Sequence, residues 1–289
     1  MTISINPPAP APSTPQTPPL QRDVLTPDGL RIRTHQWGTP EGQDVLFIHG
    51  FSQAGLCWQK QVNAPALAHL RMVTYDFRGH GASDKPVDAI FYREPERWAG
   101  ELAAILEQCE LKKPVLVGWS YAGRIISDYL SIHGSSALGG IVFVDAVTSN
   151  ERHFYGSCNR LMRQMYSENL EENIAATCTF LRNCFEVQPD QDLFQTLLAA
   201  NMVVPAPVRA ALFGRPCEHD AMLSALDLPV LVTQGAQDIV VAPAMAEHIA
   251  ALIPQAGLEM FEGIGHAPFL EAADRFNASL ATFIRTRCA

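Results

Sequence analysis

Three residues of the types that together activate a hydroxyl group lie at turn-like positions in the sequence. Ser120 lies in LVGWSYAGR, where an apolar run ends and small residues follow. Asp238 follows the apolar run PVLVTQG, and His266 lies in the glycine-containing segment FEGIGHAPFLE. A serine hydroxyl is a poor nucleophile until a base accepts its proton, and the base needs a carboxylate that orients it. The pattern therefore indicates nucleophilic catalysis with Ser120 as nucleophile, His266 as base and Asp238 as orienting acid.

The residues around Ser120 favour a sharp turn from a strand into a helix. Gly118 and Ala122 are small enough for a turn that exposes the serine Oγ, and the segment that follows is compatible with a helix. Such a turn leaves the Tyr121 backbone N–H at the start of the helix, where it can stabilise an oxyanion. For this short motif alone, a buried serine that caps a helix is an equally good interpretation.

The elements that must position these residues alternate between short β-rich runs and helical stretches. Most of the runs are continuously apolar and end at turn residues, which is typical of strands buried on both faces. The expected strands cover residues 30–38, 44–50, 71–79, 114–120, 140–146, 229–235 and 257–263. Between them, residues 94–108 place Trp98, Leu102, Ile105 and Leu106 on one helical stripe. The alternation predicts an α/β fold with a parallel sheet and right-handed crossovers.

Ligand chemistry in a parallel α/β sheet gathers at the carboxyl ends of the strands. Asp145 also ends an expected strand, so it is a second candidate for the orienting acid. We favour Asp238, because it lies in the better turn after its strand. The chain order serine, aspartate, histidine is the order that this sheet architecture requires.

One region departs from the alternation and predicts a separate layer. Residues 148–214 are rich in Met, Leu, Phe and Asn, with no strand-like run and with helical stretches at 168–186 and 192–214. An all-helical insert between two strands is most simply a cap or lid over the strand ends, whose Met and Phe side chains would give the pocket an apolar ceiling. The core then consists of residues 21–147 and 215–289.

The first twenty residues form a proline-rich segment that we expect to be a disordered tail. They have neither a basic start nor an apolar core, so we expect no signal peptide. No later segment approaches the roughly 20 apolar residues that a membrane span requires.

Composition excludes several classes of partner. The net charge is −9 and no basic run occurs, which argues against nucleic acid and anionic membranes. The seven cysteines are scattered without a C-x-x-C pair, so neither a zinc ribbon nor a thioredoxin-like motif is indicated. A reduced cytoplasmic location and a small-molecule substrate are the expectations that remain, and the oligomeric state stays open.

Taken in order, the motifs HGFS, YDFRGHGAS, GWSYAG, GAQDIVVAP and GHAPFLE resemble those of the α/β-hydrolase fold superfamily, over about residues 22–289. The resemblance implies a mostly parallel eight-stranded sheet with helices on both faces and a helical lid insert. It also implies the triad named above and an oxyanion hole formed by the backbone N–H groups of Phe51 and Tyr121. Serine at position 120 disfavours the dehalogenase and epoxide-hydrolase branches, which attack with a carboxylate. The sequence departs from the family pattern at position 122, where it has alanine in place of the second glycine of the turn around the serine.

The resemblance further implies a serine hydrolase of the esterase or cofactor-free haloperoxidase-like branch. The expected reaction is cleavage of a small, largely apolar carboxylic ester or lactone through an acyl-enzyme on Ser120, without a metal or organic cofactor. The candidates for the pocket wall are Trp58, Trp119 and Phe269. A perhydrolase or a C–C bond hydrolase with the same triad is the nearer alternative, and a small-molecule receptor with a retained triad is the alternative of another class.

Overall fold

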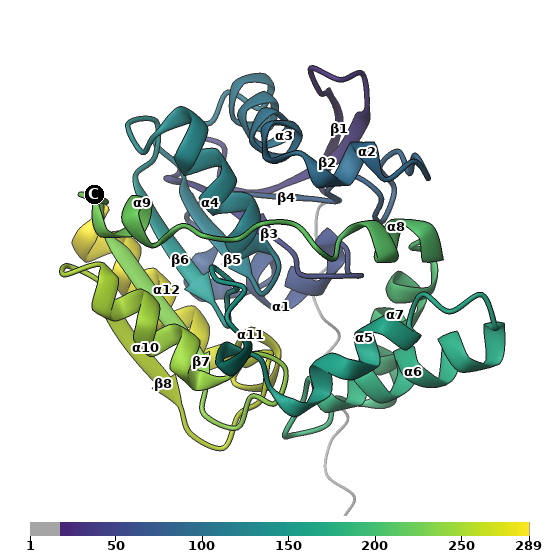
Figure 1. Cartoon of the computed structure of the whole chain (residues 1–289). Coiled ribbons are helices and arrows are strands. Elements are labelled where there is room, and N and C mark those ends of the chain that lie inside the picture. Colours follow the sequence, from purple (N-terminus) through teal and green to yellow (C-terminus); the bar gives the residue numbers. More distant parts are fainter. Residues whose placement is uncertain (1–17, 289) are drawn as a thin grey trace, which may run out of the picture.

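The computed structural model of the protein describes residues 18–288 and contains one eight-stranded sheet (Figure 1). The order of the strands across the sheet is β1-β2-β4-β3-β5-β6-β7-β8. The pairs β1–β2 and β2–β4 are antiparallel, and the other five pairs are parallel. The mostly parallel sheet expected from the sequence is confirmed. The strands are β1 (Leu20–Leu25), β2 (Arg31–Gly38), β3 (Asp44–Ile48), β4 (Arg71–Tyr75), β5 (Val115–Trp119), β6 (Gly140–Val144), β7 (Val230–Gly235) and β8 (Gly257–Phe261).

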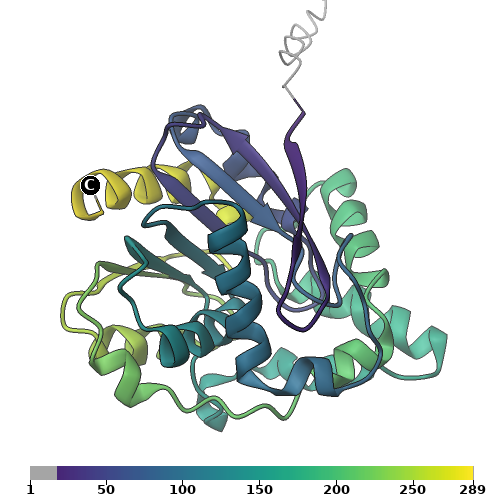
Figure 2. The same cartoon turned by 90° about the horizontal axis from the view of Figure 1, so that it is seen from above.

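Helices cover both faces of this sheet (Figures 1 and 2). Helices α3, α4 and α10 lie on one face, and α1 and α12 pack together on the other. The helices of the core are α1 (Gln59–Val62), α2 (Ile90–Arg93), α3 (Pro95–Gln108), α4 (Ala122–His133), α9 (Asp220–Ser224), α10 (Pro243–Leu252), α11 (Pro268–Glu271) and α12 (Ala273–Arg287). No helix of the described chain is long and apolar enough to cross a membrane.

Burial explains why the central strands have continuously apolar sequences. Every residue of β3, β5, β6 and β7 is buried, because helices cover both faces of these strands. The helical stripe predicted for residues 94–108 also faces inward, and Trp98, Leu102 and Ile105 of α3 are fully buried.

Strand β1 is the element that the sequence pattern did not indicate. Its side chains are exposed except for Val24, so no apolar alternation marks it. It forms by antiparallel pairing with β2, from Leu20 opposite Gln36 to Leu25 opposite Arg31. The tail expected at residues 1–20 lies outside the described residues up to position 17. Its predicted boundary is too late, since Leu20 already belongs to the sheet.

The insert at residues 148–214 contains helices and no strand within the described chain. Its helices are α5 (Leu161–Gln164), α6 (Leu170–Asn183), α7 (Gln191–Met202) and α8 (Ala206–Ala211). They lie together at one side of the core (Figure 1). The single helical stretch expected at 192–214 is wrong, because α7 ends at Met202 and α8 starts after Pro205. Proline has no N–H to donate and cannot continue a helix from the preceding turn.

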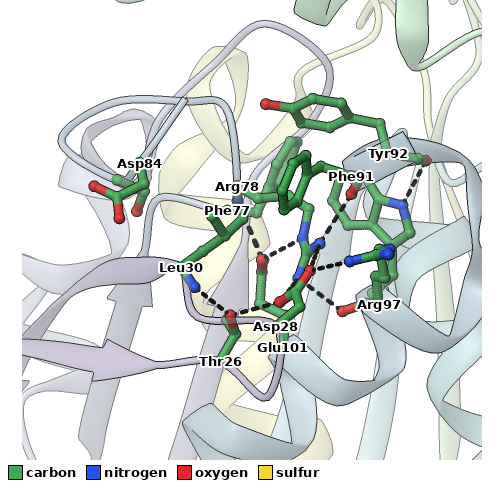
Figure 3. Close-up of polar contacts among 12 residues, drawn as sticks. Thr26, Asp28, Leu30, Phe77, Arg78, Asp84, Phe91, Tyr92, Arg97 and Glu101 are labelled. Atoms are coloured by element: carbon green, nitrogen blue, oxygen red, sulfur yellow. Dashed lines mark hydrogen bonds and ion pairs between the residues drawn. The ribbon is translucent and has the colours of Figure 1, made fainter. Parts of the chain in front are cut away.

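A buried ionic network anchors the loop after β4, which contributes to the site described below (Figure 3). Arg78 is fully buried, and its Nε donates to Glu101 of α3 at 2.8 Å. Its two Nη groups donate to Asp28 at 2.8 and 3.1 Å, and also to the carbonyl oxygens of Phe91 and Arg97. Burial alone would raise the pKa of Asp28, but hydrogen bonds from Arg78 and neighbouring donors lower it to about 2. The loop is thereby tied both to α3 and to the turn between β1 and β2.

Replacement of Glu101 by glutamine should destabilise the fold. Glu101→Gln keeps the shape of the side chain but leaves the buried Arg78 guanidinium with only half of its charge partners, and breaking a buried ion pair typically costs about 3–5 kcal/mol. The free energy of unfolding in urea would show this loss. The control is Glu94→Gln, which removes the exposed i,i+3 pair with Arg97 and should cost less than about 1 kcal/mol. Equal losses in the two variants would contradict the assignment of Arg78 as an anchor.

Candidate active site

Ser120 lies at the sharp turn between β5 and α4, with a positive φ of 56°. Its carbonyl oxygen accepts hydrogen bonds from the N–H groups of Gly123 and Val147, both at 3.0 Å, which hold the turn. A Cβ atom at Gly118 would lie 2.5 Å from the terminal methyl of Ile126, so a larger residue there would require the Ile126 side chain to shift. The strained backbone and the small neighbours are the local features that the sequence indicated for an exposed nucleophile.

Ser120, His266 and Asp238 form one hydrogen-bonded row. The Oγ of Ser120 lies 2.9 Å from Nε2 of His266, and Nδ1 of the same ring lies 2.7 Å from Oδ2 of Asp238. The residues come from the turns that follow β5, β7 and β8, and all three are buried. An imidazole placed in this way can accept the serine proton while the carboxylate stabilises the resulting imidazolium.

The Asp238 carboxylate is held in place by donors other than His266. Its Oδ1 accepts from the N–H groups of Val240 and Val241 at 2.7 and 3.0 Å. Its Oδ2, which faces His266, also accepts from Nε2 of Gln234 at 3.0 Å. These bonds fix the orientation of the carboxylate in the turn after β7. The sequence indicated the turn but not the contribution of Gln234.

Asp145, the alternative acid, lies next to Asp238 but makes no hydrogen bond to His266 among the described residues. Its Oδ1 accepts from the N–H of Gly235 at 2.9 Å, and its Oδ2 has no partner there. Burial and the neighbouring Asp238 carboxylate raise the pKa of Asp145 well above its usual range. The geometry therefore pairs His266 with Asp238.

Ligand atoms of Asp145, Asp238 and His266 lie within 4.8 Å of one another, close enough to hold a metal ion. The hydrogen bond between Nδ1 of His266 and Asp238 already uses two of these atoms. A cation there would have to break that bond. The cluster is therefore better explained as the acid end of the hydrogen-bonded row, where Asp238 orients His266.

The loop that carries His266 is fixed by the insert, which sequence reasoning missed. The N–H of His266 donates to the carbonyl of Cys184 at 2.8 Å. The Glu271 carboxylate accepts from the N–H groups of Gly265, Glu186 and Val187 at 2.8–3.0 Å. Glutamate at the end of GHAPFLE was the available signal, but its two partners in the insert lie about 85 residues away in the chain.

The aromatic residues predicted to wall the pocket lie behind the site instead. Trp58 and Phe269 are fully buried and pack together with ring centroids 4.2 Å apart, and Trp119 packs against Phe269 with ring centroids 4.9 Å apart. None of the three lines the cavity that contains Ser120. Trp119 donates from Nε1 to the carbonyl of His266 at 2.7 Å, so this cluster supports the histidine loop. The prediction failed because the side chain of Trp119 points into the core, whereas its neighbour Tyr121 lines the cavity.

Phe51 and Tyr121, the predicted oxyanion donors, line the same cavity as Ser120. Neither backbone N–H donates to a protein acceptor within the described residues. The Tyr121 N–H lies at the start of α4, where the helix dipole favours negative charge. Both groups are therefore available for a developing oxyanion.

Two neutral histidines fix the loop that carries Phe51. His49 donates from Nδ1 to the carbonyl of Gly50 at 2.8 Å and accepts the Phe77 N–H on Nε2 at 3.1 Å. His80 likewise accepts the N–H of Ser52 at 3.2 Å and donates to the Arg78 carbonyl. Burial lowers the pKa of His49 to about 4 and that of His80 well below its usual value. Both rings must stay neutral to accept these hydrogen bonds.

The contribution of these two histidines to the stability of the fold should therefore decrease as the pH falls from 6.5 to 4. The unfolded chain takes up protons at these histidines below about pH 6.5, whereas the folded protein does not, so acid favours unfolding. For His49 the expected loss in free energy of unfolding between pH 7 and pH 5 is about 2 kcal/mol. His49→Asn should reduce this difference in urea denaturation, and the exposed His69→Asn should leave it unchanged. If the free energy of unfolding of His49→Asn fell between pH 7 and pH 5 by as much as that of the wild type, His49 would not be the neutral buried histidine responsible for the loss.

A cavity of about 610 Å³ opens beside Ser120 between the core and the insert. Its apolar part is formed by Phe51, Val147, Met162, Leu212, Phe213, Val240 and Val241. Its remaining lining includes Asn150, Asn159 and four arginines from α4 and the insert. The cavity thus differs from the expected apolar ceiling, because many Met and Phe residues of the insert pack inward.

Comparison with known proteins agrees with this geometry. The sequence pattern of the alpha/beta hydrolase family matches residues 45–279. A non-heme chloroperoxidase of Kitasatospora aureofaciens is 27% identical over 90% of this chain and 98% of its own. A crystal structure from Burkholderia cenocepacia with a provisional aryl-esterase name is 38% identical, with a TM-score of 0.89 over 92% of this chain and 98% of the other. The crystal structure of a Rhodococcus esterase is 36% identical, with a TM-score of 0.87 over 92% and 99% of the two chains.

The chain belongs to the alpha/beta hydrolase family, since the family pattern covers most of its length. Within that class it is a hydrolase enzyme, as the esterase and haloperoxidase relatives over nearly the whole chain indicate. The receptor alternative is therefore set aside.

Proposed function

We propose that the protein is a serine hydrolase that cleaves a small carboxylic ester or lactone through an acyl-enzyme on Ser120. The observation that carries the proposal is the row formed by Ser120, His266 and Asp238, with hydrogen bonds of 2.9 and 2.7 Å. Two relatives with esterase names, 38% and 36% identical, support the same reaction.

In the proposed mechanism, His266 accepts the proton of Ser120 Oγ as this oxygen attacks the ester carbonyl. The oxyanion is bound by the backbone N–H groups of Phe51 and Tyr121. The tetrahedral intermediate then expels the alcohol, which takes the proton from His266. Water attacks the acyl-enzyme by the same route, with His266 as base, and releases the acid and free Ser120. Every proton is returned within the cycle, so these steps require no metal or organic cofactor.

We also propose that the insert at residues 148–214 is a lid that closes the substrate cavity. Support comes from the lining, to which it contributes Tyr155, Met162 and Phe213. The apolar part of the cavity would hold the carbon chain of the substrate. We retain a cytoplasmic location as part of the proposal, since all seven cysteines are free thiols.

A panel of p-nitrophenyl esters from acetate to decanoate tests the reaction. We expect turnover above about 1 per second and a burst of p-nitrophenolate equivalent to the enzyme, because the acyl-enzyme accumulates. Each methylene should raise kcat/KM by up to about four-fold until the cavity is full. Absence of both the burst and turnover across the panel would refute the proposal.

The chloroperoxidase relative supports a second candidate reaction, in which peroxide replaces water at the acyl-enzyme. Peracid formation from acetate and hydrogen peroxide would measure it. If peracid forms faster than any ester is hydrolysed, perhydrolysis is the main activity.

A further inference from the structure

The cavity beside Ser120 is positively charged although the protein is acidic. The chain has 30 acidic and 21 basic residues, yet the cavity is lined by Arg124, Arg152, Arg160 and Arg163. No aspartate or glutamate is among the described residues that line it. A cleft lined by charges of one sign concentrates ligands of the opposite sign, so this cavity favours an anion.

Arg124 is the buried member of this set and lies closest in the chain to Ser120. It belongs to the first turn of α4, and its side chain is mostly buried, with a relative exposure of 9%. Its guanidinium lies 5.8 Å from the centre of the Tyr121 ring. It forms no ion pair within the described chain, because the nearby Asp128 pairs with Arg215. A buried guanidinium without a carboxylate partner keeps an uncompensated positive charge, which an anionic ligand would neutralise.

The hydrogen bonds of Arg124 leave donors available for such a ligand. Its Nη2 donates to Asn150 Oδ1 and, at 2.7 Å, to the Tyr155 hydroxyl, and its Nη1 donates to the Arg215 carbonyl at 3.3 Å. A guanidinium has five N–H donors. The Nε–H and one Nη1–H therefore have no partner among the described residues, on a side chain that lines the cavity.

We propose that the substrate of this hydrolase is an ester that carries a carboxylate, and that Arg124 binds this carboxylate. The exposed Arg152, Arg160 and Arg163 attract the anion to the cavity mouth. One buried guanidinium matches a single negative charge, which favours a carboxylate over a phosphate dianion. The apolar side of the cavity takes the carbon chain between the carboxylate and the ester. The inference rests on the proposed ester hydrolysis at Ser120.

Matched pairs of esters test the preference for charge. The first pair consists of mono-p-nitrophenyl glutarate, which carries a carboxylate on its acyl side, and the neutral p-nitrophenyl pentanoate. The second pair consists of 4-acetoxybutanoate, which carries the carboxylate on its alcohol side, and the neutral butyl acetate. Hydrolysis of this pair is measured in a pH-stat. In at least one pair we expect kcat/KM to be about 10- to 100-fold higher for the anionic ester, the range of a charged hydrogen bond. This preference should shrink as the ionic strength rises. Equal or lower values for both anionic esters would overturn the inference.

Two variants test which positive charge causes the preference for anionic esters. Arg124→Gln should lower the anionic-to-neutral ratio of kcat/KM by about 10- to 100-fold. Arg163 is exposed, so Arg163→Gln should fold normally. It should lower the anionic-to-neutral ratio a few-fold through KM. The control is Arg285→Gln, which removes one positive charge from the far end of α12 and should leave the ratio unchanged. A merely structural Arg124 would affect both esters of a pair equally.

Calorimetry with glutarate separates this inference from the proposed function, because glutarate has no ester to hydrolyse. Glutarate should bind the wild type at least about 10-fold more tightly than Arg124→Gln. If neutral esters are cleaved but glutarate does not bind, the inference fails and the proposed function stands. If glutarate binds at Arg124 but no ester is cleaved, the proposed function fails and the anion site stands. Tighter binding of inorganic phosphate than of glutarate would overturn the choice of carboxylate.

Discussion

Ser120→Ala should lower kcat for ester hydrolysis by about 10³-fold or more. Without the hydroxyl group no acyl-enzyme can form, and only substrate binding and the oxyanion donors remain to accelerate attack by water. The burst of p-nitrophenolate should disappear with it. Covalent labelling by a serine-directed fluorophosphonate, followed by mass spectrometry, should occur on the wild type and not on the variant.

A second serine of the same region controls for the effect of the substitution on packing. Ser127 is fully buried on α4, and its Oγ has no hydrogen-bond partner among the described residues. Ser127→Ala should keep the label and the turnover within about two-fold, because it removes no interaction with the site. Labelling that persists in Ser120→Ala would assign the nucleophile to another residue.

Asp238→Asn should lower kcat by about 10⁴-fold, because an amide no longer fixes the His266 tautomer or stabilises its imidazolium. The change keeps the size of the side chain, and the Val240 and Val241 N–H groups can still donate to its oxygen. The loss should therefore appear in kcat while the free energy of unfolding changes little.

The matched comparison is Asp145→Asn, since Asp145 lies beside Asp238 but makes no hydrogen bond to His266 among the described residues. The substitution keeps the size of the side chain and removes no contact with His266, so kcat should fall by less than about ten-fold. A larger loss at position 145 than at position 238, in variants that are folded, would reverse the assignment of the acid.

Local sequence was sufficient to place the three residues of the hydrogen-bonded row on their turns. The strands before Ser120 and Asp238 are continuously apolar because they are buried on both faces, and the strand before His266 was recognised by its position after an amphipathic helical stretch. The small residues at 118 and 122 are also local requirements, set by the space inside the turn. Patterns of this kind depend on neighbours in the chain, so a sequence contains them directly.

Residues that act through distant contacts were not visible in the sequence. Glu271 binds backbone groups of the insert about 85 residues away, and β1 becomes a strand only when it pairs with β2. The direction of a side chain at a turn was equally hidden, and Trp119 and Phe269 were assigned to the pocket for that reason. A bulky aromatic residue has the same sequence signature in a core as on a cavity wall.

The sequence by itself determined the parallel α/β sheet, its helical insert and the order of serine, aspartate and histidine along the chain, because periodicity and turn chemistry are properties of short segments. Only the tertiary structure decided which acid meets His266, and it did so through a 2.7 Å hydrogen bond between Asp238 and Nδ1 of His266. It also decided the charge of the cavity. Arg124, Arg160 and Arg163 are ordinary polar positions on separate helical segments, and only the packing of the insert against α4 brings them around one space next to Ser120.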